Sequence, residues 1–257
     1  MDILTTRRGA CLEIAFNRPQ KKNALTAQMY TLMAEALAAA ENDAGVRVVL
    51  FHGTTEAFTA GNDLEDFAQR PPTGEDAPVF RFLMAVARAT RPLVAAVNGP
   101  AVGLGTTLLL HCDLVYAGDN ARFSLPFASL GLVPEFGSSY LLPLIAGHQR
   151  AAELLLLAEP FGAEKAREAG FVTKVLPAGD TLDAARAGCD RLASLPPASI
   201  RLTRALLKDA HRTQVEAQLR TEGNHFRRML GEPAAREALS AFLEKRKPDF
   251  GKLESNP

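Results

Sequence analysis

A single glutamate in an apolar, glycine-marked segment is the most chemically informative residue of the chain. Glu135 lies in the segment Gly131–Tyr140, downstream of two glycine-bearing turns at Ala60–Asp63 and Val102–Gly105. A carboxylate in such surroundings suits proton transfer beside an activated carbonyl group. The two turns can supply backbone N–H donors for the oxyanion that this transfer creates. Taken together, the three segments indicate an enzyme that acts on an acyl thioester.

The same glutamate also fits a purely structural role. Glu135 follows Pro134 and precedes the polar run Gly137–Ser139, which predicts that it lies in the first turn of a helix. Proline followed by glutamate is common there, because the carboxylate interacts favourably with the helix dipole. The segment alone favours the structural role, and its combination with the two glycine turns favours catalysis.

Strand and helix patterns alternate through the first two-thirds of the chain and must position these segments. Strands are expected at 11–16, 46–51, 93–97, 114–117 and 122–124, and helices at 26–42, 79–89 and 103–111. A polar, proline-rich loop is expected over 65–74, next to the first glycine turn. Alternating helices and apolar strands predict an α/β core with mostly parallel strand pairing.

The strand pattern stops near residue 178, and helical patterns follow to the C-terminal end. They cover 181–195, 199–210, 213–230 and 233–246, with proline or glycine marking breaks. This shift predicts a core over residues 1–195 that carries the active site. Residues 196–257 are expected to form a helical C-terminal subdomain that packs on the core or on a neighbouring subunit.

Composition and charge exclude several classes of partner. The chain has 257 residues, no formal net charge and an ordinary 47% of hydrophobic residues, so nothing indicates a nucleic-acid partner. The uncharged stretch 92–110 approaches the length of a membrane span, but Asn98–Pro100 divides it into a strand and a helix. We therefore expect no membrane partner.

The cysteines and the short motifs indicate the compartment of the protein and exclude several classes of enzyme. Cys11, Cys112 and Cys189 are widely spaced, which indicates a reducing, cytoplasmic compartment and no zinc site. No nucleophile-elbow, phosphate-loop or metalloprotease motif is present. The segment Ala101–Thr106 holds only half of a dinucleotide-binding fingerprint, which is weak support for a nucleotide cofactor.

Several spaced segments resemble the crotonase (enoyl-CoA hydratase/isomerase) superfamily over essentially the whole chain. They are, in the family's order, 17–25, 57–67, 91–103, 112–113 and 241–250. The resemblance implies an α/β fold built as a spiral of ββα turns, with a helical C-terminal trimerisation region. It also implies a homotrimer or a dimer of trimers.

The resemblance assigns roles to main-chain groups. The N–H groups of Asn62 and Leu104 are expected to hold the thioester oxygen. Coenzyme A, which is part of the substrate rather than a cofactor, is expected to contact the chain around Lys22, Ala24, Leu25 and Ala60. We further expect one of Lys21 and Lys22 to meet a phosphate, Asp63 to cap a helix that begins at Leu64, and no metal to be bound.

The resemblance also separates branches of the family. Hydratases of the family share two glutamates, and the resemblance places these at the positions that Thr107 and Phe127 occupy here. Adding water requires both a base and an acid, so a chain lacking both carboxylates should be nearly inert as a hydratase. The region 125–140 instead resembles the Δ3,Δ2-enoyl-CoA isomerase branch, in which a glutamate at the position of Glu135 moves the proton.

An apolar pocket is expected to raise the pKa of Glu135, with Phe127, Leu132 and Phe136 among its walls. Phe127 and Leu132 fit plain core positions equally well. Four alternatives stay open: a hydratase of the same fold; the same fold acting on other acyl groups, including ring-containing thioesters; a thioester hydrolase; and a non-catalytic acyl-CoA-binding homologue.

Overall fold

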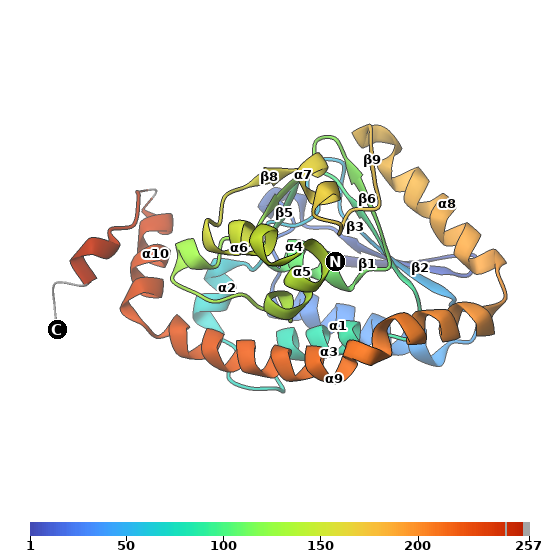
Figure 1. Cartoon of the computed structure of the whole chain (residues 1–257), viewed down its shortest axis with the longest axis horizontal. Helices are drawn as coiled ribbons and strands as arrows, with labels where there is room; N and C mark the ends of the chain where they lie inside the picture. The colour runs from blue at the N-terminus through green and yellow to red at the C-terminus, as the bar shows by residue number, and fades with distance from the viewer. Residues whose placement is uncertain (245, 254–257) are drawn as a thin grey trace.

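A six-stranded sheet forms the centre of the molecule in the computed structural model, which describes residues 1–244 and 246–253. Its strand order is β1-β2-β3-β4-β6-β9 (Figure 1). Only β1 and β2 pair antiparallel, and every later pair in this sheet is parallel. The strands are β1 Ile3–Arg8, β2 Cys11–Phe16, β3 Val48–His52, β4 Leu93–Val97, β6 Leu114–Gly118 and β9 Lys174–Leu176.

A second, smaller sheet contains β5 Pro100–Val102, β7 Arg122–Ser124 and β8 Phe161–Gly162. Thr59 extends it by a parallel bridge to Ala101, and Ala101 pairs in turn with Phe123. The chain thus passes three times from the large sheet to the small one and on to a helix. This repeat confirms the predicted crotonase-like spiral of ββα turns.

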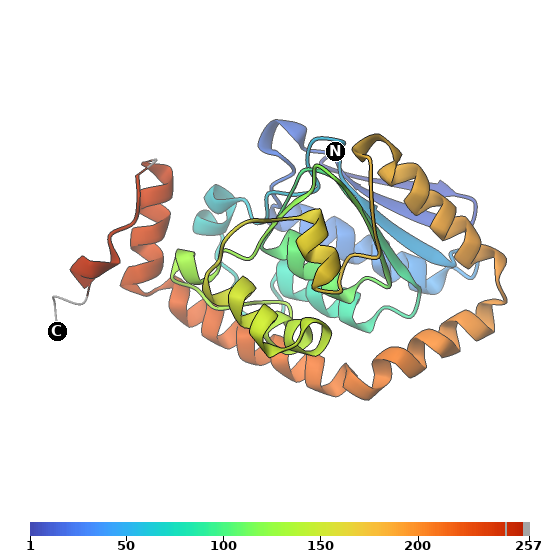
Figure 2. The same cartoon turned by 45° about the horizontal axis from the view of Figure 1, so that its top comes forward.

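Helices cover both faces of the large sheet (Figure 2). Alternate strand residues point to opposite faces: Val49 and Phe51 join the main core with α1 Ala27–Asn42 and α3 Pro78–Arg88. Val48 and Leu50 instead join a smaller apolar cluster with α8 Thr181–Ser194. Burial on both faces explains why these strands read as continuous apolar runs.

The other helices lie around these layers. They are α2 Leu64–Gln69, α4 Leu104–Thr107, α5 Ser138–Ala146, α6 His148–Leu156, α7 Ala163–Glu168, α9 Pro197–Leu230 and α10 Pro233–Leu243. Short 3₁₀ turns occupy Pro19–Lys21, Leu108–His111, Ala128–Leu130, Ala178–Asp180 and Phe250–Leu253. None of the helices in the described ranges is long and apolar enough to cross a membrane.

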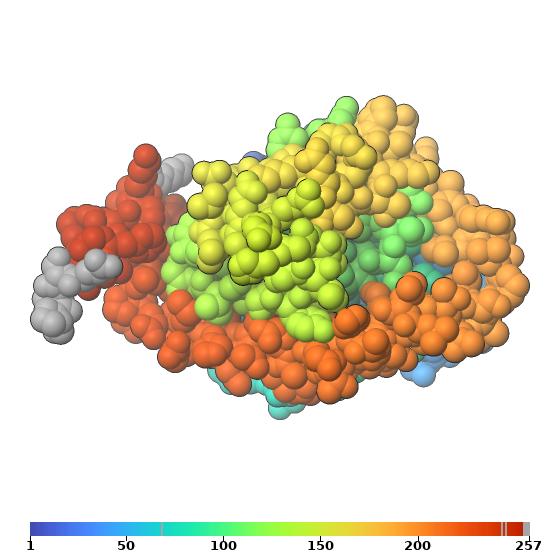
Figure 3. Space-filling model, viewed as in Figure 1, coloured from blue at the N-terminus to red at the C-terminus, as the bar shows by residue number. Residues whose placement is uncertain are grey.

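The C-terminal helices differ from the sequence prediction. The helices expected at 199–210 and 213–230 are one continuous helix of 34 residues, α9, which lies along an edge of the molecule beside α5 (Figure 3). No proline or glycine separates residues 210 and 213, and packing of buried Val215 and Leu219 carries the helix through. The division of the chain at residue 195 stays a prediction.

Three further boundaries differ. The first half of the expected loop 65–74 is helix α2, because the Asp63 side chain caps it. The expected helix 103–111 changes after α4 to a tighter 3₁₀ turn. The expected helix 233–246 ends at Leu243. Position 245 of that expected helix and residues 254–257 of the predicted subdomain lie outside the described residues.

Helix α4 packs closely against the segment around Thr59, and this contact requires a glycine at position 105. A Cβ atom there would lie 2.6 Å from Thr59 Cγ2 and 3.2 Å from the Thr59 carbonyl oxygen. We expect Gly105→Ala to lower the free energy of unfolding by about 1–3 kcal/mol, measured by urea denaturation. Gly179→Ala is the control: no atom would lie within 4 Å of its Cβ, so a change below about 0.5 kcal/mol is expected. Equal stability of the two variants would contradict the crowding argument.

Candidate active site

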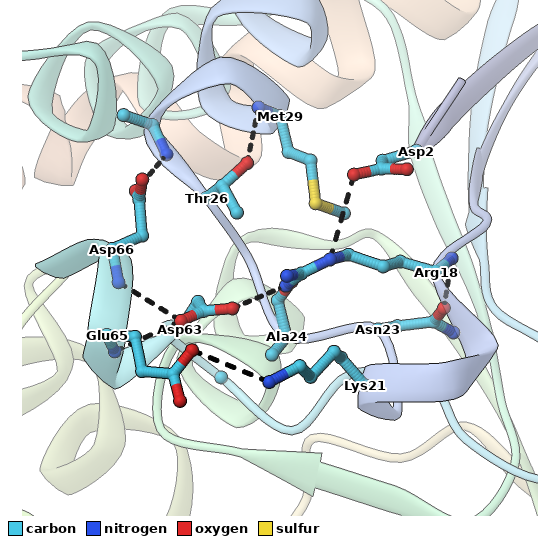
Figure 4. Close-up of polar contacts among 12 residues, drawn as sticks. Asp2, Arg18, Lys21, Asn23, Ala24, Thr26, Met29, Asp63, Glu65 and Asp66 are labelled. Carbon is cyan, nitrogen blue, oxygen red and sulfur yellow. Dashed lines mark hydrogen bonds and ion pairs between the residues drawn. The ribbon is translucent and has the colours of Figure 1, made fainter.

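The first glycine turn is held by an ion pair between the partly buried Arg18 and the buried Asp63 (Figure 4). Arg18 Nη1 donates to Asp63 Oδ2 at 2.5 Å and to the Ala24 carbonyl oxygen at 3.0 Å. Asp63 Oδ1 accepts from the N–H groups of Glu65 and Asp66, both at 3.1 Å, so the predicted cap of the helix at Leu64 is confirmed. Burial opposes ionisation of Asp63, but Arg18 and the two amides bring the pKa of Asp63 below its ordinary value.

The segment expected to contact coenzyme A runs beside this turn. Ala60 N–H donates to the Lys22 carbonyl oxygen at 2.9 Å, and Leu25 N–H donates to the Gly61 carbonyl oxygen at 2.8 Å. Lys22 is exposed and has a left-handed φ of 48°. The structure therefore brings Lys22, Ala24, Leu25 and Ala60 together, and their contacts with a substrate stay a prediction.

The two glycine turns abut one another. Gly61 has a φ of 82°, and a Cβ atom there would lie 2.7 Å from the Val102 carbonyl oxygen. Upstream, Thr59 pairs in parallel with Ala101. Asn62 lies three residues after Thr59, and Leu104 lies three residues after Ala101. The two residues therefore follow the paired positions at the same distance along adjacent parallel segments.

The main-chain N–H groups of Asn62 and Leu104 are available to a ligand. Within the described part of the chain, neither donates to a protein acceptor. Leu25 bonds to the groups on either side of Asn62, namely the Gly61 carbonyl and the Asp63 N–H, so the Asn62 N–H points away from Leu25. Leu104 begins α4, and first-turn amides have no partner within their helix. Both donors suit an oxyanion hole.

Glu135 and Asn62 line the same cavity, whose volume is about 50 Å³. Glu135 is 9% exposed, and Thr107 Oγ1 donates to its Oε1 at 2.5 Å. Since Thr107 ends the helix that Leu104 begins, α4 connects the second N–H donor to the carboxyl group. The cavity is otherwise mainly apolar, and its aromatic lining consists of Phe67, Phe80, Phe136 and Phe226.

Glu135 does not lie in a helical turn, so that prediction is wrong. Helix α5 begins three residues later, at Ser138, after two left-handed residues: Phe136 with φ 64° and Gly137 with φ 70°. A left-handed residue other than glycine costs about 1–2 kcal/mol, so Phe136 must be held by its surroundings. Its ring stacks on His111 with centroids 4.1 Å apart, and His111 Nε2 donates to its carbonyl oxygen at 2.7 Å. This turn directs Glu135 into the cavity instead of along the helix.

Burial raises the pKa of Glu135 to about 8. The Thr107 hydrogen bond favours the ionised form and opposes this shift, whereas the negative charge of Glu222 adds to it. A carboxyl group that titrates near 8 is matched to proton transfer at neutral to mildly alkaline pH. The expected apolar environment of Glu135 is therefore present.

Sequence reasoning missed two polar residues near the site. Tyr30 OH donates to Asn62 Oδ1 at 2.5 Å from the buried face of α1. Burial, then the charges of Glu135 and Asp66, raise the pKa of Tyr30. Glu222 reaches the same region from α9. Both residues occupy helix faces whose pattern predicts only core packing, so the sequence offered no signal for them.

Only some of the residues predicted to contact the acyl group line the cavity that contains Glu135. Phe136 lines the cavity with Glu135, whereas Phe127 and Leu132 are not among its lining residues. Leu132 N–H donates to the Phe127 carbonyl oxygen at 2.8 Å; Phe127 is buried in the main core, and the partly buried Leu132 packs against that core. Leu25 lines a second cavity, which shares Phe67 with the first. Over residues 1–244 and 246–253, no cluster of three or more histidine, cysteine or acidic residues is arranged to hold a metal ion.

Comparisons with known proteins identify relatives across the whole chain. A sequence profile of the family described as Enoyl-CoA hydratase/isomerase matches residues 6–253. The chain is 37% identical to enoyl-CoA delta isomerase 2 of Rattus norvegicus, with 95% of this chain and 64% of that protein covered. It is 35% identical to 1,2-epoxyphenylacetyl-CoA isomerase of Escherichia coli (strain K12), with 96% and 97% covered. Hydratases match at 31–33% identity.

Among solved structures, Pseudomonas aeruginosa OdaA superposes with a TM-score of 0.92 at 46% sequence identity. The match covers 94% of this chain and 98% of that one. This superposition shows that the glycine turns and the Glu135 segment belong to a fold that the chain shares with known relatives.

Replacing Glu135 should change how stability depends on pH. Between its ordinary value of 4.5 and about 8, the folded chain keeps a proton that the unfolded chain releases, so stability falls as pH rises. Glutamine keeps the shape and the acceptor for Thr107 but does not titrate. We expect Glu135→Gln to raise the melting temperature more at pH 8 than at pH 5, measured by calorimetry. An increment independent of pH would contradict the raised pKa.

Proposed function

The chain belongs to the enoyl-CoA hydratase/isomerase family, and from that membership we propose that it is a Δ3,Δ2-enoyl-CoA isomerase. One observation carries the proposal: Glu135 is the sole carboxylate among the described residues that line the cavity. By the family resemblance, Thr107 and Phe127 occupy the positions at which hydratases carry glutamates. One carboxyl group suits a reaction that removes and returns a single proton, and not one that adds water.

The proposed mechanism uses one base and two main-chain donors. Glu135 takes a proton from C2 of a 3-enoyl-CoA, and the electrons move into the thioester to give a dienolate. The N–H groups of Asn62 and Leu104 bind the dienolate oxygen as its charge develops. The Glu135 carboxylic acid then donates the same proton to C4, which yields the 2-trans-enoyl thioester and restores the carboxylate.

The surroundings of Glu135 support both steps. The low polarity of the cavity keeps its pKa near 8, closer to that of an activated carbon acid than an exposed glutamate would be. The Thr107 hydroxyl holds one carboxyl oxygen, which leaves the other to exchange the proton. Exclusion of water by Phe80, Phe136 and Phe226 limits loss of the proton to solvent.

Ring-containing acyl groups form the second candidate substrate class. The observation that favours them is the aromatic lining of the cavity, since phenylalanine side chains pack well against a substrate ring. One of the relatives is named for a phenylacetyl-CoA derivative. The same base and the same oxyanion donors would serve this substrate, so a comparison of acyl groups separates the two candidates. A hydrolase or a non-catalytic binder has no comparable observation in its favour.

Assembly and location belong to the same proposal. We propose the homotrimer or dimer of trimers that the family resemblance implies. A subunit interface on α9 would cover Leu202, Leu206 and Leu207, each of which is at least 63% accessible. Exposed apolar side chains clustered on one helix are typical of a subunit interface. A cytoplasmic location, and a reaction without any cofactor beyond the substrate's own coenzyme A, stay predictions from the sequence.

Removing the carboxyl group tests the proposal directly. We expect Glu135→Ala to lower kcat for isomerisation of 3-hexenoyl-CoA by about 10²–10⁴-fold, the usual contribution of a general base. Formation of the 2-trans product is followed by its absorbance, and hydration of crotonyl-CoA is assayed in the same preparation. Robust hydration by the wild type, or isomerisation that survives the substitution, would overturn the assignment.

The pH dependence of isomerisation provides a second test. Because the base must be ionised in the free enzyme, kcat/KM should rise with pH and level off above about 8, the pKa of Glu135. Below that value we expect about a tenfold loss for each pH unit. A profile already level at pH 6 would show that a group with an ordinary carboxyl pKa does the work.

A further inference from the structure

A second buried glutamate lies behind the catalytic segment. Glu222, in α9, is 4% exposed. Its Oε2 accepts from the Gly137 N–H at 2.6 Å, and its Oε1 accepts from the Ser139 N–H at 2.9 Å and the Ser139 hydroxyl at 2.5 Å. These contacts join the C-terminal helix to residues that follow Glu135 by two and four positions.

The pattern of donors indicates that Glu222 is a carboxylate. All three of its partners donate, and Gln218 Nε2 donates to the Ser139 hydroxyl oxygen at 2.7 Å, which leaves the hydroxyl hydrogen for Glu222. The two amides lie at the N-terminal end of the nine-residue helix α5, where amides lack internal partners and the helix dipole favours an anion. Burial raises the pKa of Glu222 above its ordinary value, and the hydrogen bonds from Ser139 and Gly137 oppose that shift by favouring the carboxylate.

One peptide group is held at both of its polar atoms. The carbonyl oxygen of Phe136 accepts from His111 Nε2, and the N–H of Gly137, in the same peptide group, donates to Glu222. Phe136 and Gly137 are the two left-handed residues of this segment. Burial lowers the pKa of His111 to about 3, so its imidazole is neutral and keeps its donor role across the working pH range.

We propose that Glu222 is a positioning residue of the proposed isomerase: together with His111 it clamps the Phe136–Gly137 peptide group and thereby fixes Glu135 in the cavity. The inference rests on the proposed function for its kinetic part only. Without the clamp, Phe136 can relax from its left-handed conformation, and the carboxyl group it follows would move. Misplacement of a base by about 1 Å costs on the order of 10²-fold in rate.

Glu222 also acts on Glu135 through its charge. Its negative charge adds to the effect of burial in raising the pKa of Glu135. The other charged or titratable groups facing this region are few: Tyr30 from α1, His111 from the turn after α4, and Arg227 from α9, which donates to Asn224 Oδ1 at 2.5 Å. None of them is hydrogen-bonded to either glutamate in the described structure, so removal of the Glu222 charge is not masked by a bonded cation.

The experiment compares Glu222→Gln with Gln218→Met. Glutamine has the size of glutamate but lacks its charge, and its amide group must face one of the three donors. The control removes a neutral hydrogen bond to the same Ser139 hydroxyl and leaves the charge in place. The pKa of Glu135 is read by carbon-13 NMR in protein labelled at the glutamate carboxyl carbons, with Glu135→Gln identifying the signal.

We expect the pKa of Glu135 to fall in Glu222→Gln and to keep its wild-type value in Gln218→Met. We also expect kcat for 3-hexenoyl-CoA to fall by about 10²-fold in Glu222→Gln, with KM little changed. Glu222→Asp keeps the charge but shortens the reach, so it should lose kcat while the pKa of Glu135 stays raised. This variant decides the positioning claim if Glu222→Gln does not fold.

Two results would overturn the inference: an unchanged Glu135 pKa and kcat in Glu222→Gln, or an equal pKa shift in Gln218→Met. Failure of the proposed function is a separate result, since it would appear as wild-type protein that does not isomerise 3-hexenoyl-CoA. In that case the NMR titration, which needs no turnover, still decides whether Glu222 controls Glu135.

Discussion

A carboxyl group in an apolar cavity loses the water that would stabilise its charge, and it needs other contacts to keep a fixed position. Among the described residues, the carboxyl group of Glu135 has one hydrogen bond, from Thr107, and its pKa is near 8. Its direction is set by the left-handed pair that follows it, which His111 and Glu222 hold from opposite sides. The cavity walls, the start of α5 and the C-terminal helix α9 therefore all influence the position or the pKa of the Glu135 side chain.

The positions of the two proposed oxyanion donors depend on strand pairing rather than on any side chain. Thr59 pairs with Ala101, so the turns that follow each residue lie beside one another. Gly61 allows the turns to touch, because a side chain there would collide with the neighbouring carbonyl oxygen. The spiral topology thus places two free N–H groups at matching offsets, and α4 carries the second of them to within one helical turn of the residue that binds Glu135.

Much of the fold follows from local patterns. The strand at Leu93–Val97 was predicted at its observed bounds, because burial on both faces gives an uninterrupted apolar run. The cap at Asp63 also followed from the sequence, since capping acts within three residues. The continuity of α9 did not, because its polar surface gives a weak pattern and contacts with α3 and α5 decide whether the helix continues.

The sequence by itself determined the proposed reacting groups: Glu135 and the glycine turns that bear Asn62 and Leu104. These are features of residue type and short spacing, and a resemblance among segments can carry them. Only the tertiary structure decided how Glu135 is oriented and tuned. Glu222 lies 85 residues from the Gly137 amide it binds, and no periodicity relates positions so far apart. Such contacts arise when packing brings helix faces together, so they become visible only after the chain has folded.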